Sequence, residues 1–272
     1  MTKKYPFSFL LSAAVLLGLV FVAIFAPFIA PYSPSDVLTA PFSQPTADHR
    51  LGADALGRDL LSRTIYGLRY TLGIASFVTV MSCILGVTLA ITAAVRKGWV
   101  DIVIGRSVDA IMAIPQIIFA LIVLAVAGIS ITTLVCTMIV LEATLFFRIL
   151  RASAGDIAAM DFIEVARLRG EKMGWYIFRE ILPNLAPTLI AELGLRFAFA
   201  SLFISALSFL GVGIQPPQAD LGGLVRENAL AISIGRGAPL VPAFMIAAIA
   251  IGTNGIVDWF VHKYSIRGEL AQ

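Results

Sequence analysis

Four charged residues lie within long apolar stretches, where an ionised side chain needs a counter-charge or water. They are Asp109, Glu142, Glu192 and Arg196. Glu192 and Arg196 are one helical turn apart in the favourable acid-first order, which predicts a structural ion pair rather than a substrate site. Glu142, within "VLEATLFF", is the candidate for a polar transport pathway. Glu142 has two alternative roles. It could be the structural partner of a cation on another chain, or its side chain could reach the membrane interface.

The sequence offers no catalytic machinery of its own. It has no G-x-x-x-x-G-K-[ST] phosphate-binding loop and no G-x-S-x-G nucleophile motif. Cys83 and Cys136 lie in separate apolar runs, and His49 and His262 stand far apart without neighbouring metal ligands. We therefore predict no catalytic residue, no metal site and no cofactor on this chain. Because the chain lacks a phosphate-binding loop, ATP and Mg²⁺ would have to be bound by partner subunits.

The composition predicts an integral membrane protein. Hydrophobic residues make up 59% and charged residues 14% of the 272 positions, and the mean hydropathy is +0.92. A soluble domain carries about 25% charged residues. The net charge of +3 is small and its residues are dispersed, which argues against nucleic acid as a partner and for membrane lipid.

Six apolar segments are long enough to cross a bilayer, which takes about 20 residues each. The expected fold is therefore an all-α membrane protein with six transmembrane helices. The first helix and its long loop, residues 1–69, look like an addition to a five-helix core at 70–261, and residues 262–272 form a tail. The expected spans are 7–30, 70–95, 107–127, 130–150, 187–210 and 239–261.

Basic residues indicate which ends of these spans face the cytoplasm. An even number of spans places both termini on one side, and most basic residues fall on that same side. We therefore expect cytoplasmic N and C termini and a long cytoplasmic loop at 151–186. The residues that carry this bias are Lys3, Lys4, Arg96, Lys97, Arg106, those within 148–179, Lys263 and Arg267.

The loop contains "FIEVARLRGEKMGWYIFREILPNLAP", a charged and glycine-containing stretch in an otherwise apolar chain. Residues 161–169 lack proline and glycine, which predicts a short helix that Gly170 ends. A second short helix is expected at about 175–181, before Pro183.

The first short helix has the features of a docking surface. Ala166 and Gly170 are small and allow another surface to approach closely, while Glu164, Arg167 and Arg169 surround that contact with charge. The alternative is a solvated amphipathic loop whose aromatic residues lie in the lipid headgroups.

Residues 164–183 resemble the cytoplasmic EAA loop of bacterial ABC importer permeases. They read E-V-A-R-x-x-G and, ten residues later, I-L-P, where Val165 replaces an alanine of the usual E-A-A. In that family the loop forms a coupling helix seated in a groove of the ATP-hydrolysing subunit. The resemblance thus implies a coupling role for Glu164, Ala166, Arg167, Gly170, Ile181, Leu182 and Pro183.

Two further stretches narrow the resemblance to the C-type permease of the dipeptide, oligopeptide and nickel importers. They are "HRLGADALGRDLLSRTIYGLRYTL" at 49–72 and "SFLGVGIQPPQADLGGL" at 208–224, with Ala53 and Leu221 where that group usually has threonine and tryptophan. From its residues alone, the first stretch predicts a turn-rich loop tied by Arg58 to Asp54 or Asp59.

The resemblance implies a type I ABC importer permease fold in the bacterial inner membrane. Its expected partners are a second, B-type permease subunit, two ATP-binding subunits and a soluble solute-binding protein. Di- and oligopeptides are the leading substrates, with nickel or another small solute as the alternative. From the residues alone, an ion-coupled secondary transporter and a membrane scaffold without transport remain as rivals.

Overall fold

The computed structural model describes residues 7–269, except for the side chains of Arg167 and residues 264–269. Lys3 and Lys4 and the side chain of Arg267, which contribute to the expected orientation, thus lie outside the described residues. Strand pairing within the described range is limited to two isolated bridges, Val37 with Arg58 and Ala53 with Asp59. The helices are α1 (Phe7–Ile24), α2 (Ala26–Ile29), α3 (Leu60–Arg96), α4 (Gly98–Met112), α5 (Gln116–Ala127), α6 (Ile131–Ala158), α7 (Asp161–Leu168), α8 (Met173–Tyr176), the π-helix η1 (Ile177–Ile181), α9 (Leu182–Phe209), α10 (Leu221–Glu227), the 3₁₀-helix η2 (Ala229–Ile234) and α11 (Leu240–Glu269).

The helices are long and apolar enough to cross a membrane five times, or six times if α4 and α5 together form one span. The five single spans are α1, α3, α6, the continuous run of α8, η1 and α9, and α11. The all-α membrane fold class is confirmed.

The predicted span at 107–127 is broken in the middle and starts earlier than expected. The chain is helical from Gly98, and α4 and α5 meet at an angle of 87° across residues 113–115. Pro115 explains the break, because proline has no N–H to donate and disfavours helical geometry at the residue before it. Hydropathy averaged along the sequence shows that both halves are apolar, but it does not detect the bend between them.

The second span also differs from its predicted start. It begins at Leu60 rather than residue 70, and Asp59 caps it by accepting a hydrogen bond from the Ser62 N–H at 2.8 Å. The first turns carry Ser62, Arg63 and Thr64, all buried. Their polarity hid this part of the helix from a hydropathy criterion, although the Ser62 and Thr64 hydroxyls donate hydrogen bonds to Asp59 and to the Leu60 carbonyl.

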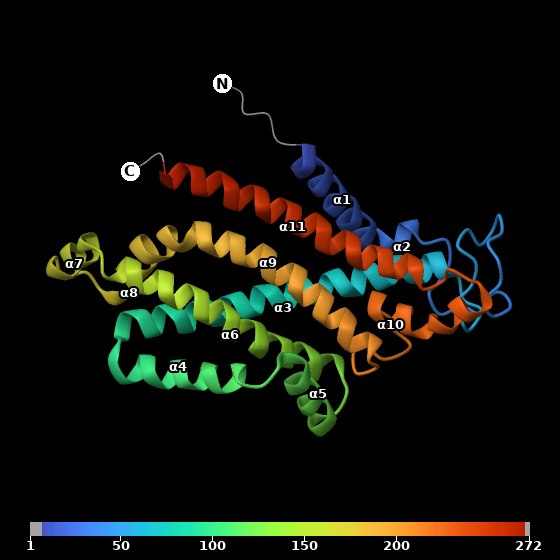
Figure 1. The fold of residues 1–272 in the computed structure, drawn as a ribbon, viewed down its shortest axis with the longest axis horizontal. Coiled ribbons are helices and arrows are strands. Elements are labelled where there is room, and N and C mark those ends of the chain that lie inside the picture. The colour runs from blue at the N-terminus through green and yellow to red at the C-terminus, as the bar shows by residue number, and fades with distance from the viewer. Residues whose placement is uncertain (1–6, 270–272) are drawn as a thin grey trace.

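The long helices run along one axis and leave two distinct ends (Figure 1). The α7 end carries α7 and α8, and the opposite α10 end carries α10 and the loop at 31–59. The central core lies among α3, α6 and α9, where Val78, Met138 and Ile204 are fully buried. Close approach is essential there, since a Cβ at Gly86 of α3 would meet the Phe146 Cβ of α6 at 2.4 Å.

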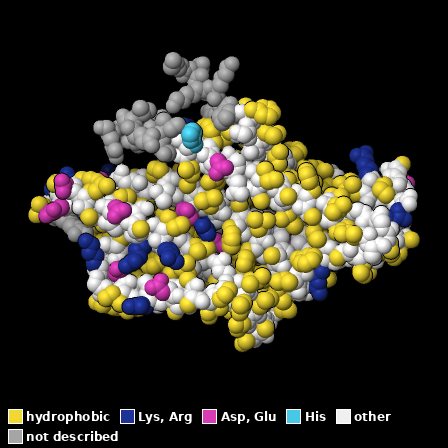
Figure 2. Space-filling model, viewed as in Figure 1, with side chains coloured by type: hydrophobic (Ala, Val, Ile, Leu, Met, Phe, Trp, Pro, Cys, Tyr) yellow, Lys and Arg dark blue, Asp and Glu magenta, His cyan; other side chains and the backbone are white. Residues whose placement is uncertain are grey.

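The surface matches a chain that lies in lipid. Figure 2 shows hydrophobic side chains over the middle of the visible face, while Lys, Arg, Asp and Glu gather mainly at the α7 end. Exposed large apolar side chains include Phe77 and Ile84 on α3, Ile122 on α5 and Phe244 on α11. An apolar belt of this kind is what a bilayer solvates.

Candidate functional site

Helix α7 rests on the ends of three long helices through a narrow apolar face. Ile163 and Ala166 are fully buried in a cluster with residues of α3, α6, η1 and α9. Ala166 therefore faces inward, and the prediction that it offers a surface for close approach by another chain is wrong. Residue spacing along a helix does not decide which way the face that carries Ala166 points. The other members of the cluster are Ile91, Ala94, Ala154, Ile157, Ala158, Tyr176, Ile181 and Leu185.

The outward side of α7 is unexpectedly apolar. Phe162, Val165 and Leu168 are 37%, 51% and 81% exposed, and the exposed Glu164 lies beside them. Because Leu168 is among the most exposed apolar side chains described, this face presents hydrophobic area for contact with another surface. The interval of three residues between these side chains is the sequence signal that could have identified this face.

Gly170 ends α7 through its backbone conformation. Its φ is +79°, and the Glu171 N–H donates to the Ala166 carbonyl at 3.1 Å, as in a Schellman C-cap. A Cβ at Gly170 would have no atom of this chain within 4 Å. The predicted stop is confirmed, and its cause is the left-handed geometry. Next to Gly170, the Arg169 guanidinium lies 5.7 Å from the centre of the Trp175 ring.

The prediction of a separate short helix at 175–181 is wrong. α8 and η1 run without a break into α9, so that Met173–Phe209 is one helical run. Pro183 lies just after η1 inside this run, and a π-helical turn is one of the local adjustments that accommodate a proline within a helix. Of the other predicted coupling residues, Ile181 is buried, Leu182 is half-buried and Pro183 is exposed. The side chain of Arg167 lies outside the described residues.

The intramembrane charges meet between α6 and α9. Arg196 donates from Nε to Glu192 Oε2 at 3.1 Å, across one turn of α9. Glu142 of α6 is 1% exposed, and its Oε2 has no hydrogen-bond partner within the described residues. Glu142 interacts electrostatically with both Arg196 and Glu192. The three side chains form one charge cluster, in which both acids are buried and Arg196 is half-buried.

A cavity of about 360 Å³ lies next to this cluster, at the break between α4 and α5. Arg196 forms part of its wall, with Pro115 and Gln116 from the break and Thr144 from α6. Arg196 thus joins the buried acids to a space large enough for a small solute. At the opposite end of α4, the Asp101 carboxylate binds Arg151 of α6 in a bidentate pair at 2.5 and 2.6 Å.

A second charge network stands at the α10 end. Arg58 Nε donates to Asp54 Oδ2 at 2.7 Å, which confirms the predicted tie, and Arg58 Nη2 donates to Glu227 Oε2 at 3.0 Å. Arg63 Nη1 contacts the same two acids at 2.5 and 2.7 Å. No local pattern predicts the Arg63–Glu227 contact, since the two residues are 164 positions apart.

A membrane-spanning helical bundle that carries a small amphipathic helix at one end is an architecture suited to a membrane transport subunit. The chain belongs to the family described as binding-protein-dependent transport system inner membrane component, which matches residues 86–266. A second family, the N-terminal transmembrane domain of oligopeptide transport permease C, matches residues 8–49. The protein is therefore a multi-pass inner-membrane permease of an ABC importer.

Named relatives cover nearly the whole chain. The chain is similar to the dipeptide transport system permease protein DppC of Alkalihalophilus pseudofirmus, with 31% identity over 90% of this chain and 81% of the relative. A putative peptide transport system permease protein of Brucella suis shares 34% identity over 92% and 85%. The glutathione transport system permease protein GsiD of Pectobacterium atrosepticum shares 28% over 88% and 80%.

Proposed function

We propose that this permease carries di- or oligopeptides into the cytoplasm as half of a translocation pore. A second, B-type permease subunit completes the pore, and a soluble solute-binding protein delivers the peptide. Two ATP-binding subunits hold ATP and Mg²⁺ and drive the cycle. The relatives' names, which include dipeptide, peptide and glutathione transport, support the substrate class.

The α7 end docks the ATP-binding subunit. The observation that carries this proposal is the exposed apolar face of Phe162, Val165 and Leu168 on a helix whose opposite face is fully buried. Protein interiors are close-packed, so a displacement of α7 is transmitted to the helix ends it contacts. Glu164 and Gly170 border the docking face, while Ala166 and Ile181 hold α7 in its seat.

The orientation follows from this docking. The α7 end, including the loop at 151–186, faces the cytoplasm, as do the two termini and the tail at 262–272. Residues 1–69 add one span and an external loop to the transport core at 70–261. Nucleotide-driven movement of the ATP-binding subunits would shift the core between two packings.

Glu142 lines or borders the solute pathway in this proposal. This role for Glu142 is supported by the cavity at the α4–α5 break, because the wall of that cavity includes Arg196, an electrostatic partner of Glu142. Buried ionisable residues within membrane spans commonly mark such pathways. The Glu192–Arg196 ion pair keeps part of the cluster's charge compensated.

The docking proposal is tested by Leu168→Glu, with Leu230→Glu as the matched control. Both residues are large, apolar and highly exposed, at 81% and 75%, but Leu230 lies at the α10 end. We expect Leu168→Glu to reduce at least tenfold the recovery of a subunit that carries a G-x-x-x-x-G-K-[ST] loop, which corresponds to about 1.4 kcal/mol. Leu230→Glu should leave that recovery unchanged at equal permease levels. Equal recovery with both variants would refute docking at α7.

A further inference from the structure

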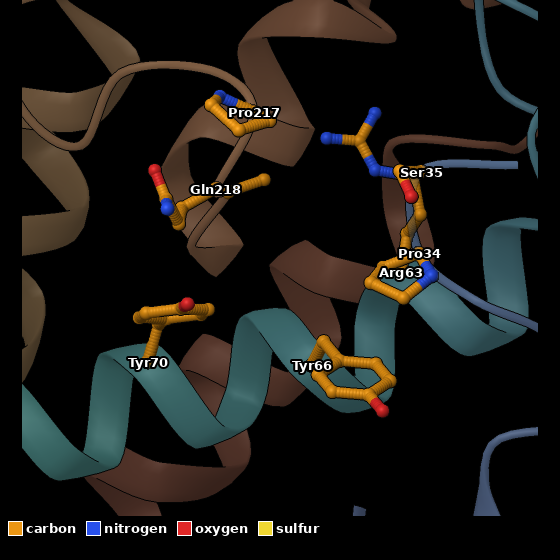
Figure 3. Close-up of a pocket in the computed structure, with 8 residues that line it drawn as sticks. Pro34, Ser35, Arg63, Tyr66, Tyr70, Pro217 and Gln218 are labelled. Atoms are coloured by element: carbon orange, nitrogen blue, oxygen red, sulfur yellow. The ribbon is translucent and has the colours of Figure 1, made fainter. Parts of the chain in front are cut away.

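A second cavity, of about 270 Å³, lies at the α10 end (Figure 3). Three segments that are distant in sequence form it, and its size is near the lower limit for small-molecule sites. The loop before α3 contributes Pro34 and Ser35, α3 contributes Arg63, Tyr66 and Tyr70, and the loop before α10 contributes residues 217–219.

Arg63 is the unusual member of this cavity. It is 2% exposed, and while its Nη1 binds Asp54 and Glu227, its Nη2 has no hydrogen-bond partner within the described residues. Buried donors in native proteins are nearly always paired, so an unpaired guanidinium nitrogen indicates a place for an acceptor.

The unpaired donor of Arg63 favours an anionic acceptor. Asp54 and Glu227 together balance the charges of Arg58 and Arg63, so the preference for an anion comes from the free Nη2 donor rather than from net charge. A guanidinium group can only donate hydrogen bonds. A carboxylate matches it, because guanidinium groups bind carboxylates through strong, directional hydrogen bonds.

The remaining walls suit the rest of a small amphipathic solute. Tyr66 and Tyr70 follow one another by a turn of α3, and Figure 3 shows the Tyr70 ring facing Gln218 across the cavity. Aromatic rings offer apolar contact, and the tyrosine hydroxyls and the Gln218 amide offer hydrogen bonds. Ser35 and Gln218 are exposed, so small movements of either open a route to Arg63.

We propose that this cavity binds the carboxylate of a small solute, with Arg63 as its counter-charge. The identity of this solute rests on the proposed function, from which the carboxylate is the C-terminus of a short peptide. The cavity then holds the peptide at the outer end of the permease before it enters the pathway. It is separate from the charge cluster of Glu142, Glu192 and Arg196.

The test measures peptide binding to the assembled transporter in nanodiscs without the solute-binding protein. The probes are the dipeptide Ala-Phe and its C-terminal amide, which lacks the negative charge. We expect the amide to bind about tenfold more weakly or worse, as loss of a charge-assisted hydrogen bond requires. Arg63 itself is a poor target, since its removal leaves the buried Asp54 with one fewer partner.

Ser35→Trp and Ser33→Trp form the matched pair. Each removes the hydrogen bond between the Ser33 and Ser35 hydroxyls, but only Ser35 lines the cavity. Ser35→Trp should weaken Ala-Phe binding at least tenfold, about 1.4 kcal/mol, and Ser33→Trp should not. Equal affinity for acid and amide, or unchanged binding by Ser35→Trp, would overturn the proposal.

Two further measurements separate the possible sources of failure. If Ser35→Trp weakens attachment of the solute-binding protein but not peptide binding, the carboxylate belongs to that protein and the proposal is wrong. Peptide uptake by cells tests the proposed function independently. Absence of uptake, together with the expected acid-to-amide preference in nanodiscs, would refute the peptide importer and uphold the carboxylate site.

Discussion

Asp220 is a single buried carboxyl group that couples the folding stability of this protein to pH. It is fully buried before α10, where its Oδ1 accepts the Gly223 N–H at 3.0 Å and caps the helix. Its Oδ2 has no hydrogen-bond partner within the described residues. Burial raises the pKa of Asp220 to about 6, although the bond from Gly223 opposes that shift. The folded protein thus retains a proton that the unfolded chain loses at lower pH.

We predict that stability falls as the pH rises from about 4 to 6. In that window the unfolded chain's carboxyl group ionises while the folded one stays protonated, which costs roughly 3 kcal/mol. Asp220→Asn keeps a capping oxygen but cannot ionise. Its melting temperature in detergent should therefore rise relative to wild type between pH 4 and pH 7. The exposed Asp48 provides the control, and Asp48→Asn should show no such trend. A pH-independent difference for Asp220→Asn would contradict the prediction.

At the scale of elements, α7 is held by one buried face and one glycine. Ile163 and Ala166 seat it on α3, α6 and α9, and Gly170 turns the chain back after its last residue. An eight-residue helix is too short to be stable alone in water. Its order therefore depends on these tertiary contacts and on the cap.

Gly170→Ala should loosen α7 by about 1 kcal/mol, because alanine is strained at positive φ. We expect roughly fivefold faster hydrogen exchange of the α7 amides, measured by mass spectrometry, since 1.4 kcal/mol corresponds to a factor of ten. Gly170→Asn should have a smaller effect, since asparagine tolerates this conformation better. Gly174 also has open space around it but no positive φ, so Gly174→Ala should leave the exchange unchanged. Equal exchange in all three variants would show that backbone strain at Gly170 is unimportant.

At the scale of the whole molecule, the two ends differ in kind. The α7 end presents an exposed apolar face amid charged side chains, and the α10 end contains a buried ion network and a cavity. α11 runs back along the bundle from the α10 end toward the α7 end (Figure 1). This polarity suits a protein that meets different partners on the two sides of a membrane.

Single cysteines test the orientation in a background where Cys83 and Cys136 are replaced. We expect Leu56→Cys, in the loop at 31–59, to react from outside intact cells with a reagent that cannot cross the membrane. Leu168→Cys should react only after the membrane is made permeable. Both positions are exposed, at 58% and 81%, so access to the reagent depends on the side of the membrane. Outside labelling at position 168 would reverse the proposed orientation.

The sequence by itself determined the class of protein and much of its plan. Apolar length is a local property of the chain, so the membrane helices could be identified from residue order alone. The stop at Gly170 and the bond between Arg58 and Asp54 are also local, since each involves residues within five positions of one another. The motif at 164–183 indicated the permease family, which the family match at 86–266 confirms.

Only the tertiary structure decided which faces are buried and which distant residues meet. Ala166 points inward because the ends of α3, α6 and α9 converge beneath α7, and no local pattern encodes that convergence. Proline marked the place of the bend at Pro115, but its angle of 87° is seen only in the structure, where α4 and α5 each contact α6. Arg63 meets Glu227 because α10 folds back over the start of α3. Contacts over such separations depend on how whole helices pack, whereas hydropathy and propensity sum over neighbouring residues only.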